Sequence, residues 1–274
     1  MSSVSRKTSM LVVGLVSTLA MLGVASPAMA ALEGEFAVFK ECPITTPELR
    51  ACLHAVSSSG EFHVGNRTVP LTNPVTLQGG FTINEAGEMK FVGAANGETI
   101  VPVPQKVPGG LLGIEGLGGE VTATTELAGP ASNIGINEIN LAEEKGIALS
   151  LPVKVKLGNP ILGNNCYLGS NAHPIVLELT TGTTSPPKPN KPISGKAGEF
   201  TVNPTGEILI VKNNSLVNNS FAAPGVQGCD LVPFLVDPIV DLDLGVPAAA
   251  GHNTVILNGT LEQASAEVIK EHEA

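Results

Sequence analysis

GGFTINEAGEMKFV at residues 79–92 and GEFTVNPTGEILIV at residues 198–211 are the stretches that decide the fold. In both, apolar and polar residues alternate on either side of a segment that contains Asn and Gly. Alternation with a period of two is typical of strands with one buried face, and Asn and Gly tolerate the backbone of tight turns. Each stretch therefore predicts a β-hairpin.

The two stretches also resemble each other. Phe81 aligns with Phe200, Asn84 with Asn203 and Gly87 with Gly206. This alignment leads us to expect an internal duplication, with a first β half at residues 31–144 and a second at residues 145–274. It also predicts that the two Phe side chains occupy equivalent buried positions. The alternative is that many β-hairpins share such a pattern without common origin.

Working outward, further strands are predicted where short β-branched segments are bounded by Gly, Pro or Asn. They lie at residues 61–64, 67–71, 120–127, 147–157, 175–180 and 254–261. The proline-rich residues 185–192 are expected to form an exposed loop, and residues 261–274 a frayed, exposed C-terminal helix. The sequence thus predicts an all-β, sandwich-like fold with a short N-terminal helix and a C-terminal helix.

Residues 1–30 have the features of a secretory signal peptide. Arg6 and Lys7 precede an apolar stretch at residues 10–24, and Ala28-Met29-Ala30 is a small-x-small cleavage pattern. This stretch is short for a membrane span, which needs about 20 residues. The apolar run that comes closest later, at residues 231–246, contains three Asp and two Pro. We therefore expect a secreted or cell-surface protein that begins at Ala31 and has no transmembrane segment.

Composition narrows the classes of function. Hydrophobic residues make up 43% of the chain and aromatic residues only 3%, with no Trp and one Tyr. Sugar sites and single-stranded nucleic-acid sites commonly use aromatic stacking, so both are disfavoured. Without Arg6 and Lys7 the chain keeps 13 basic against 25 acidic residues, a net charge of −12. Such a chain repels phosphate backbones, which argues against a nucleic-acid partner.

The four cysteines predict two disulfides. Cys42, Cys52, Cys166 and Cys229 all follow the signal peptide, and an even number in an exported chain is typical of structural crosslinks. Three pairings are open, and we favour Cys42–Cys52 with Cys166–Cys229. The first pair flanks a segment in which Thr46 could cap a short helix. A metal site is the less favoured alternative, because the spacings are not those of a zinc motif.

Residues that could carry chemistry are sparse. The five histidines form no zinc-hydrolase motif, and no nucleophile elbow is present. Asp237, Asp241 and Asp243 are weak candidates for a Ca²⁺ site, because Asp-x-Asp on a strand puts both carboxylates on one face. The stronger interpretation is an ordinary half-exposed strand, with Val240, Leu242 and Leu244 on its other face. We therefore expect no metal, no cofactor and no catalytic residue that sequence alone can name.

Residues 153–195 resemble a block of exported actinobacterial proteins of unknown function, most specifically in the turn Asn164-Asn165-Cys166-Tyr167-Leu168-Gly169 and the Thr- and Pro-rich run after it. The resemblance implies secretion and no mechanism. Together these observations predict a non-enzymatic cell-envelope or extracellular protein that binds a ligand or a protein partner, or is structural. The alternative is a secreted hydrolase whose site is assembled from distant residues. A cleft with a paired His and carboxylate would favour the hydrolase, and an exposed apolar patch the binding protein.

Overall fold

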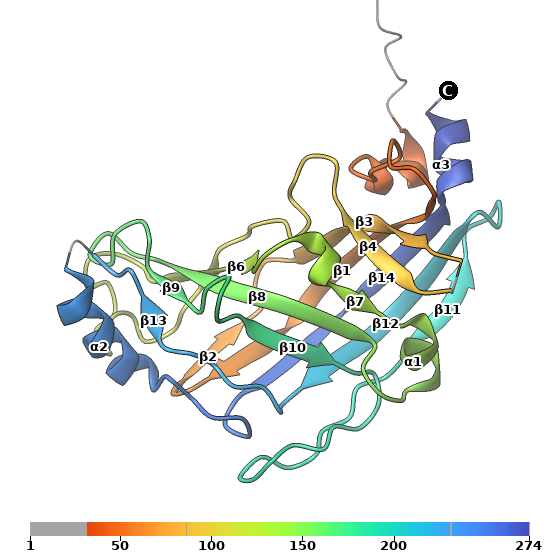
Figure 1. Ribbon diagram of the computed structural model, residues 1–274. Helices are drawn as coiled ribbons and strands as arrows, with labels where there is room; N and C mark the ends of the chain where they lie inside the picture. Colours follow the sequence, from red (N-terminus) through yellow and green to blue (C-terminus); the bar gives the residue numbers. More distant parts are fainter. Residues whose placement is uncertain (1–31, 86, 231, 274) are drawn as a thin grey trace, which may run out of the picture.

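The protein is a β-sandwich in which two antiparallel sheets pack against each other (Figure 1). A computed structural model describes residues 32–85, 87–230 and 232–273. Strands account for 42% of it and helices for 14%, which confirms the predicted all-β class. The predicted signal peptide and its cleavage site lie outside the described residues.

The first sheet has the order β11-β12-β14-β1-β3-β4, and β2 pairs with β1 beyond this path. β1 and β14 lie at its centre and pair over most of their length. The strands are β1 (Leu49–Val64), β2 (Arg67–Pro70), β3 (Val75–Ile83), β4 (Met89–Gly93), β11 (Glu199–Val202), β12 (Ile208–Asn218) and β14 (Thr254–Ser265).

The second sheet has the order β13-β9-β8-β6-β5, and both β10 and β7 also pair with β8. Its strands are β5 (Gln105–Lys106), β6 (Thr122–Leu127), β7 (Gly135–Ile136), β8 (Leu149–Gly158), β9 (Tyr167–Leu168), β10 (Ile175–Leu179) and β13 (Val226–Gln227). The helices are η1 (Gly34–Phe39), η2 (Ala131–Asn133), α1 (Glu138–Glu143), α2 (Pro233–Leu244) and α3 (Ala266–His272). α2 lies at one end of the sandwich, and η1 and α3 lie together at the other (Figure 1).

The main core fills the space between the sheets. Leu53, Val255 and Leu257 of the first sheet belong to the same buried cluster as Val153 and Leu177 of the second. A smaller cluster joins η1 and α3 to the strands beneath them, with Phe36, Phe39 and Ile269 at its centre. Burial of apolar surface in these two clusters is the main force that holds the sheets and the end helices together.

The two predicted halves do not form separate β units. The first sheet takes β1 to β4 from residues before 145 and β11, β12 and β14 from residues after it, and the second sheet is mixed in the same way. β1 pairs directly with β14. Strands from both predicted halves therefore build each sheet, and the boundary at residue 144 does not separate two folds.

Both predicted hairpins exist, but the expected equivalence of Phe81 and Phe200 is wrong. Phe81 is 4% exposed and Phe200 is 48% exposed. The reason is strand order: β3 is an inner strand of the first sheet, whereas β11 is its edge strand. The register differs too, since Phe81 pairs with Phe91 and Phe200 with Val211, one position beyond the aligned residue.

What the two hairpins share is a turn. The side-chain oxygen of Asn84 accepts a hydrogen bond from the backbone N–H of Glu88, and that of Asn203 accepts one from Glu207. The glycine before each Glu has a φ of 80° at Gly87 and 78° at Gly206, a conformation that favours glycine. The common string Asn-x-x-Gly-Glu therefore encodes a local turn of the same kind in both hairpins.

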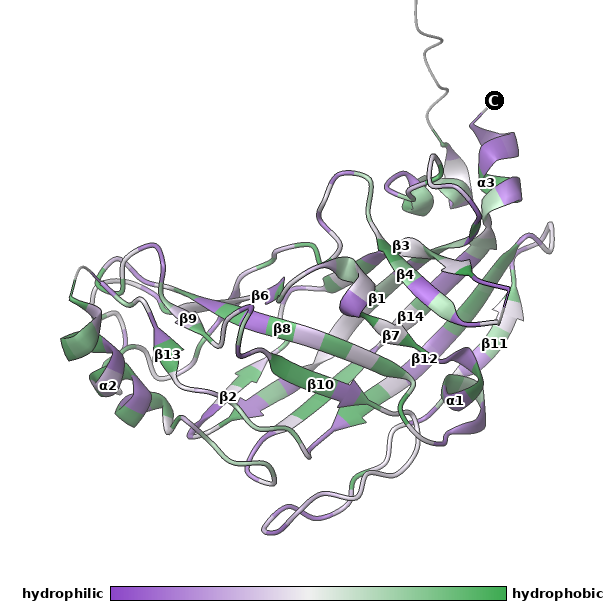
Figure 2. Cartoon of the chain, viewed as in Figure 1, coloured by the Kyte–Doolittle hydropathy of each residue, from purple (hydrophilic) through white to green (hydrophobic). Residues whose placement is uncertain are grey.

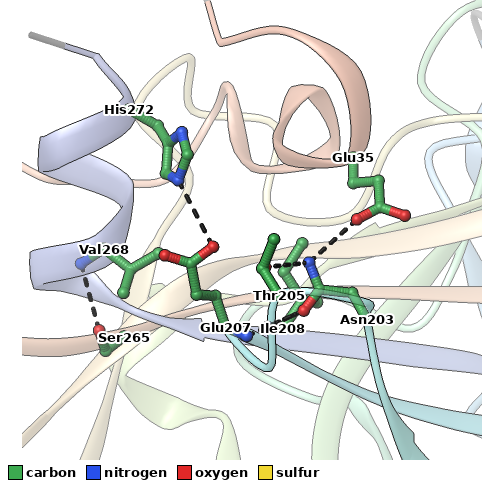
Figure 3. A network of polar contacts seen from close by, with 8 residues as sticks. All are labelled: Glu35, Asn203, Thr205, Glu207, Ile208, Ser265, Val268 and His272. Carbon is green, nitrogen blue, oxygen red and sulfur yellow. Dashed lines mark hydrogen bonds and ion pairs between the residues drawn. The ribbon is translucent and has the colours of Figure 1, made fainter.

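The second turn also anchors the end of the molecule (Figure 3). Asn203 Nδ2 donates to Glu35 Oε2 of η1 at 2.9 Å, and Glu207 Oε2 lies 3.8 Å from His272 Nε2 of α3. The ring of His272 stacks on Phe36. These contacts tie the β11–β12 turn to both helices at this end.

Two predicted helices differ from the structure. The segment between Cys42 and Cys52 is not a helix but a turn that leads into β1, and Glu48 in this turn has a φ of 62°. The N-terminal helix is η1, which precedes Cys42. At the other end, β14 continues to Ser265, and α3 is neither frayed nor fully exposed. Ser265 caps it by accepting from the N–H of Val268, and Ile269 is completely buried.

Candidate functional site

The acidic segment that the sequence analysis interpreted as a strand is the helix α2. Pro233 occupies its first turn, where a missing N–H costs nothing, and Gly245 ends it in the left-handed conformation. The spacing of Asp237 and Asp241 is that of neighbours on one helical face. The prediction of a half-exposed strand is therefore wrong, because the same residues fit a period of two and a period of 3.6.

The three carboxylates of α2 point inward and bind protein groups. Asp237 accepts hydrogen bonds from the backbone N–H groups of Gly228 and Cys229, and Asp241 accepts one from Val226 at 2.7 Å. Asp243 accepts from Arg67 Nη2 at 2.6 Å and from the N–H of Leu112 at 3.2 Å. Within the described residues no group of three or more His, Cys, Asp or Glu side chains is arranged to hold a metal ion.

Asp241 sits in an environment that disfavours its charge. Burial raises the pKa of its carboxyl above the ordinary value, and the negative charge of Asp237 adds to this rise. The hydrogen bond from the N–H of Val226 opposes both effects, because it stabilises the carboxylate. The hydrogen bond that attaches α2 to β13 therefore involves a carboxylate whose ionisation costs free energy.

The outer face of α2 is apolar. Phe234, Leu235, Ile239 and Leu242 are 78%, 58%, 52% and 82% exposed. The hydropathy colouring of Figure 2 shows hydrophobic and hydrophilic stretches alternating along this helix. Val236, Val240 and Leu244 pack against the main core on the inner side. A surface helix is normally apolar on its inner side only, so α2 is unusual in being apolar on its outer side as well.

An apolar cavity of about 90 Å³ lies between the two sheets beneath α2. We call it the α2 cavity. Alternate residues of the strands line it, among them Phe62 and Val64 of β1, Ala123 of β6 and Val155 of β8. Val240 and Leu244 of α2 close its end together with Leu111 of the glycine-rich loop at residues 107–121.

Arg67, at the start of β2, is the one basic residue that lines the α2 cavity within the described chain. Its Nη2 donates to Asp243, and its Nη1 donates to the carbonyl of Pro108 at 3.3 Å. Its Nε is buried and has no hydrogen-bond partner among the described residues. A buried donor without a partner costs free energy, so this N–H is unfavourable for the folded state.

A second cavity of about 70 Å³ continues along the space between the sheets. We call it the inner cavity. Phe62, Thr125 and Leu177 line both cavities, so these three side chains form the partition between them. Beyond the partition the inner cavity is lined by Leu77, Leu151 and Leu257 among others.

A third hollow is a broader surface groove of about 490 Å³ near β4 and β6. Gly93, Thr99 and Glu126 are among the residues that line it. Glu126 is already engaged there, with Lys154 Nζ at 3.7 Å and the hydroxyl of Tyr167 at 3.5 Å. Because this groove has no apolar enclosure comparable to the α2 cavity, we take the α2 cavity as the candidate site.

The described part of the chain contains two pairs of His and carboxylate, and neither pair lines any of these three hollows. His54 Nδ1 lies 3.3 Å from Glu262 Oε2 across β1 and β14, and His272 lies beside Glu207 at the α3 end. The feature that would favour a hydrolase, such a pair within a cleft, is not found among the described residues. The exposed apolar face that would favour a binding protein is present on α2.

Both disulfides join the cysteines that the sequence analysis favoured. Cys42 bonds to Cys52 in the cluster under η1 and α3, and Cys166 bonds to Cys229 in the main core. The second disulfide is directly linked to α2, because Asp237 accepts from the N–H of Cys229 at 2.8 Å. This disulfide therefore helps to position α2, which closes one end of the α2 cavity.

Comparison with known proteins gives no relative for this fold. No family profile matches the chain, and no curated protein or solved structure is significantly similar to it. Among the described helices none has both the length and the apolar character needed to cross a bilayer. The two disulfides are compatible with an extracellular protein.

Neither Arg67 nor Phe62 was among the site residues predicted from the sequence, and the α2 cavity was not predicted either. One available signal was the pattern of β1 and β2, in which residues 62, 64, 67 and 69 alternate and share one face. A second was the low aromatic content, used there only to disfavour stacking sites. Strands that present Val, Ala and Thr inward leave more space than strands that present Phe, Tyr or Trp.

Proposed function

We propose that this protein is an exported, non-enzymatic binding protein that holds a small apolar molecule in the α2 cavity. The observation that carries the proposal is a largely apolar cavity between the sheets, closed at one end by α2 and with Arg67 in its lining. Ligand sites are typically apolar concavities with a few polar groups that fix orientation. The disulfides and the predicted signal peptide support export.

The size of the cavity limits the ligand. An apolar cavity of about 150 Å³ in another protein admits benzene. The α2 cavity has about 90 Å³ and the inner cavity about 70 Å³. A small ring or a short alkyl chain is therefore the apolar group that fits.

The test is stabilisation of the protein by n-hexane and toluene, measured as the shift in melting temperature by circular dichroism. A ligand that binds only the folded state stabilises it by RT ln(1 + [L]/Kd), where [L] is the free ligand concentration and Kd the dissociation constant. Ala123→Leu would fill the α2 cavity and abolish the shift. Thr124→Leu is the matched control, because its side chain on the same strand does not line the cavity.

The wild-type protein and Thr124→Leu should show the same shift, and Ala123→Leu should show none. No shift in the wild-type protein at saturating hexane and toluene would contradict the proposed function. An equal shift in folded Ala123→Leu would place binding elsewhere.

A further inference from the structure

The solvent-facing side of α2 carries only apolar residues. We call this side the α2 face, and its exposed members are Val232, Phe234, Leu235, Pro238, Ile239 and Leu242. Single exposed apolar residues are ordinary on a protein surface, whereas a group of them on one side of one helix marks an interaction site. The α2 face therefore calls for a partner.

The charges of α2 narrow the kind of partner. Asp237, Asp241 and Asp243 all accept hydrogen bonds from groups of the protein itself, so none of them is part of the α2 face. The helix contains no Lys, Arg, Trp or Tyr. Helices that lie in a bilayer surface are typically flanked by such residues. The α2 face thus fits an uncharged, apolar protein surface better than a lipid surface.

The spacing of the α2 face indicates which protein surface this is. Val232, Leu235, Ile239 and Leu242 follow one another at intervals of three, four and three residues. This is the a and d pattern of a coiled-coil seam, with β-branched residues at a and Leu at d, which favours the pairing of two like helices. A second copy of this chain offers the matching helix.

The fold prepares α2 for such pairing. An isolated helix of this length is marginally stable in water, but Val236, Val240 and Leu244 hold the other side of α2 against the main core. No helix therefore has to be ordered when two copies meet, which lowers the cost of association. Because α2 lies at one end of the sandwich, two molecules can approach end to end (Figure 1).

The glycine-rich loop beside α2 enlarges the α2 face. A standard interface buries about 800 Å² per partner, and a helix of 12 residues is only about 18 Å long and 10 Å wide. Leu112 and Ile114 of the loop are 46% and 55% exposed. The N–H of Leu112 donates to Asp243 Oδ2 at 3.2 Å, so this apolar turn is tied to the last turn of α2.

We propose that the α2 face is a dimerisation surface, on which two copies of this chain pair through their α2 helices. The contact is isologous, with the same residues contributed by both copies about a two-fold axis. Leu112 and Ile114 form its margin. This proposal does not depend on the ligand proposed for the α2 cavity.

The first test is the oligomeric state of the exported protein, purified with both disulfides intact. Sedimentation velocity over a range from low micromolar to submillimolar protein should show a reversible equilibrium between monomer and dimer. Added NaCl should strengthen the dimer, because salt screens the repulsion between two acidic chains and leaves apolar contacts intact. A dimer held by ion pairs would weaken instead.

The second test places a charge in the seam. Leu242 is 82% exposed, so Leu242→Glu should fold normally, as checked by circular dichroism. It brings two carboxylates together across the contact and should raise the dimer dissociation constant about tenfold or more. The matched control is Ile139→Glu on α1, where Ile139 is 68% exposed. This control adds the same charge away from the α2 face and should change the constant by no more than about twofold.

A measurement on the wild-type protein locates the contact directly. In a dilution series of methyl-labelled protein, the NMR signals of Leu235, Ile239 and Leu242 should shift with concentration. The signal of Ile139 should stay in place. This readout holds even if Leu242→Glu does not fold.

Three results would overturn the proposal. The first is a wild-type protein that stays monomeric at every concentration. The second is a dimer whose dissociation constant Leu242→Glu leaves unchanged and whose formation shifts none of the three methyl signals. The third is a monomer that binds phosphatidylcholine vesicles and loses this binding in Leu242→Glu, which would assign the α2 face to a lipid surface.

Discussion

The Arg67–Asp243 ion pair joins β2, in the wall of the α2 cavity, to α2, which closes its end. Both side chains are largely buried, so removal of one partner leaves a charge without compensation. We predict that Asp243→Ala lowers the free energy of unfolding by about 3 kcal/mol. The double variant Arg67→Met/Asp243→Leu should lose much less, because it removes both charges. Urea unfolding of the single and double variants measures this coupling, and simply additive losses would contradict it.

A second prediction concerns the pH dependence that Asp241 contributes. Its folded pKa is raised, so ionisation destabilises the fold; the cost is absent below the ordinary value of 3.8 and complete above the raised pKa. This contribution to the free energy of unfolding therefore falls as pH rises through that window. Asp241→Asn keeps an oxygen for the N–H of Val226 and removes the charge.

Relative to the wild-type protein, Asp241→Asn should gain stability as pH rises through the window and then stay level. Urea unfolding at intervals between about pH 3 and pH 7 gives the difference at each pH. A difference that is constant across the whole range would show that the carboxyl of Asp241 carries no such penalty.

At the scale of elements, the two hairpins place the same residue type in different environments. Phe81 lies on an inner strand and is buried, whereas Phe200 lies on an edge strand and is half exposed. We predict that Phe81→Ala costs about 3–5 kcal/mol of stability and that Phe200→Ala costs within about 1 kcal/mol. Thermal and urea unfolding of the two variants form a matched comparison. Equal large losses would restore the equivalence that the duplication predicts.

These elements show what the sequence could and could not determine. Alternation located β3, β4, β6, β8, β10 and β14 because a strand's own residues decide which of its faces is buried. The same alternation did not reveal that β3 is an inner strand and β11 an edge strand, because strand order depends on residues far away in the chain. α2 was misassigned because its residues also fit a period of two, and because it is apolar on its outer side as well as on its inner side.

At the scale of the molecule, the two disulfides close loops of different length. Cys42 and Cys52 are separated by 10 residues, and Cys166 and Cys229 by 63. On the chain-entropy account, loss of the longer crosslink costs about 4 kcal/mol and loss of the shorter one about 3 kcal/mol. We predict that Cys166→Ser/Cys229→Ser lowers stability more than Cys42→Ser/Cys52→Ser, as measured by urea unfolding of both double variants. The reverse order would indicate that local packing, not loop length, decides.

The candidate site, unlike the fold, depends on the molecule as a whole. Arg67 comes from β2, Asp243 from α2 and Ala123 from β6, and each belongs to a different part of the sequence. No local motif marks such a cavity, because an unfilled volume is a property of two sheets packed together and of the small side chains between them. The cysteine pairing could be predicted because four cysteines in a chain that is expected to be exported can form two disulfides in only three ways.

The pairing of β1 with β14 also has a consequence for the way the chain reaches its fold. Ala51 faces Ser265, and His63 faces Thr254, so the middle of the first sheet joins residues near opposite ends of the described chain. β14 lies between β12 and β1 in the sheet, so these two strands cannot be joined until β14 has left the ribosome. Contacts of such long sequence separation slow folding, because loop-closure entropy is lost before they form. The first sheet is therefore completed last and at its centre, and an interruption of synthesis shortly before residue 254 would leave two unpaired strand edges instead of a nearly finished protein.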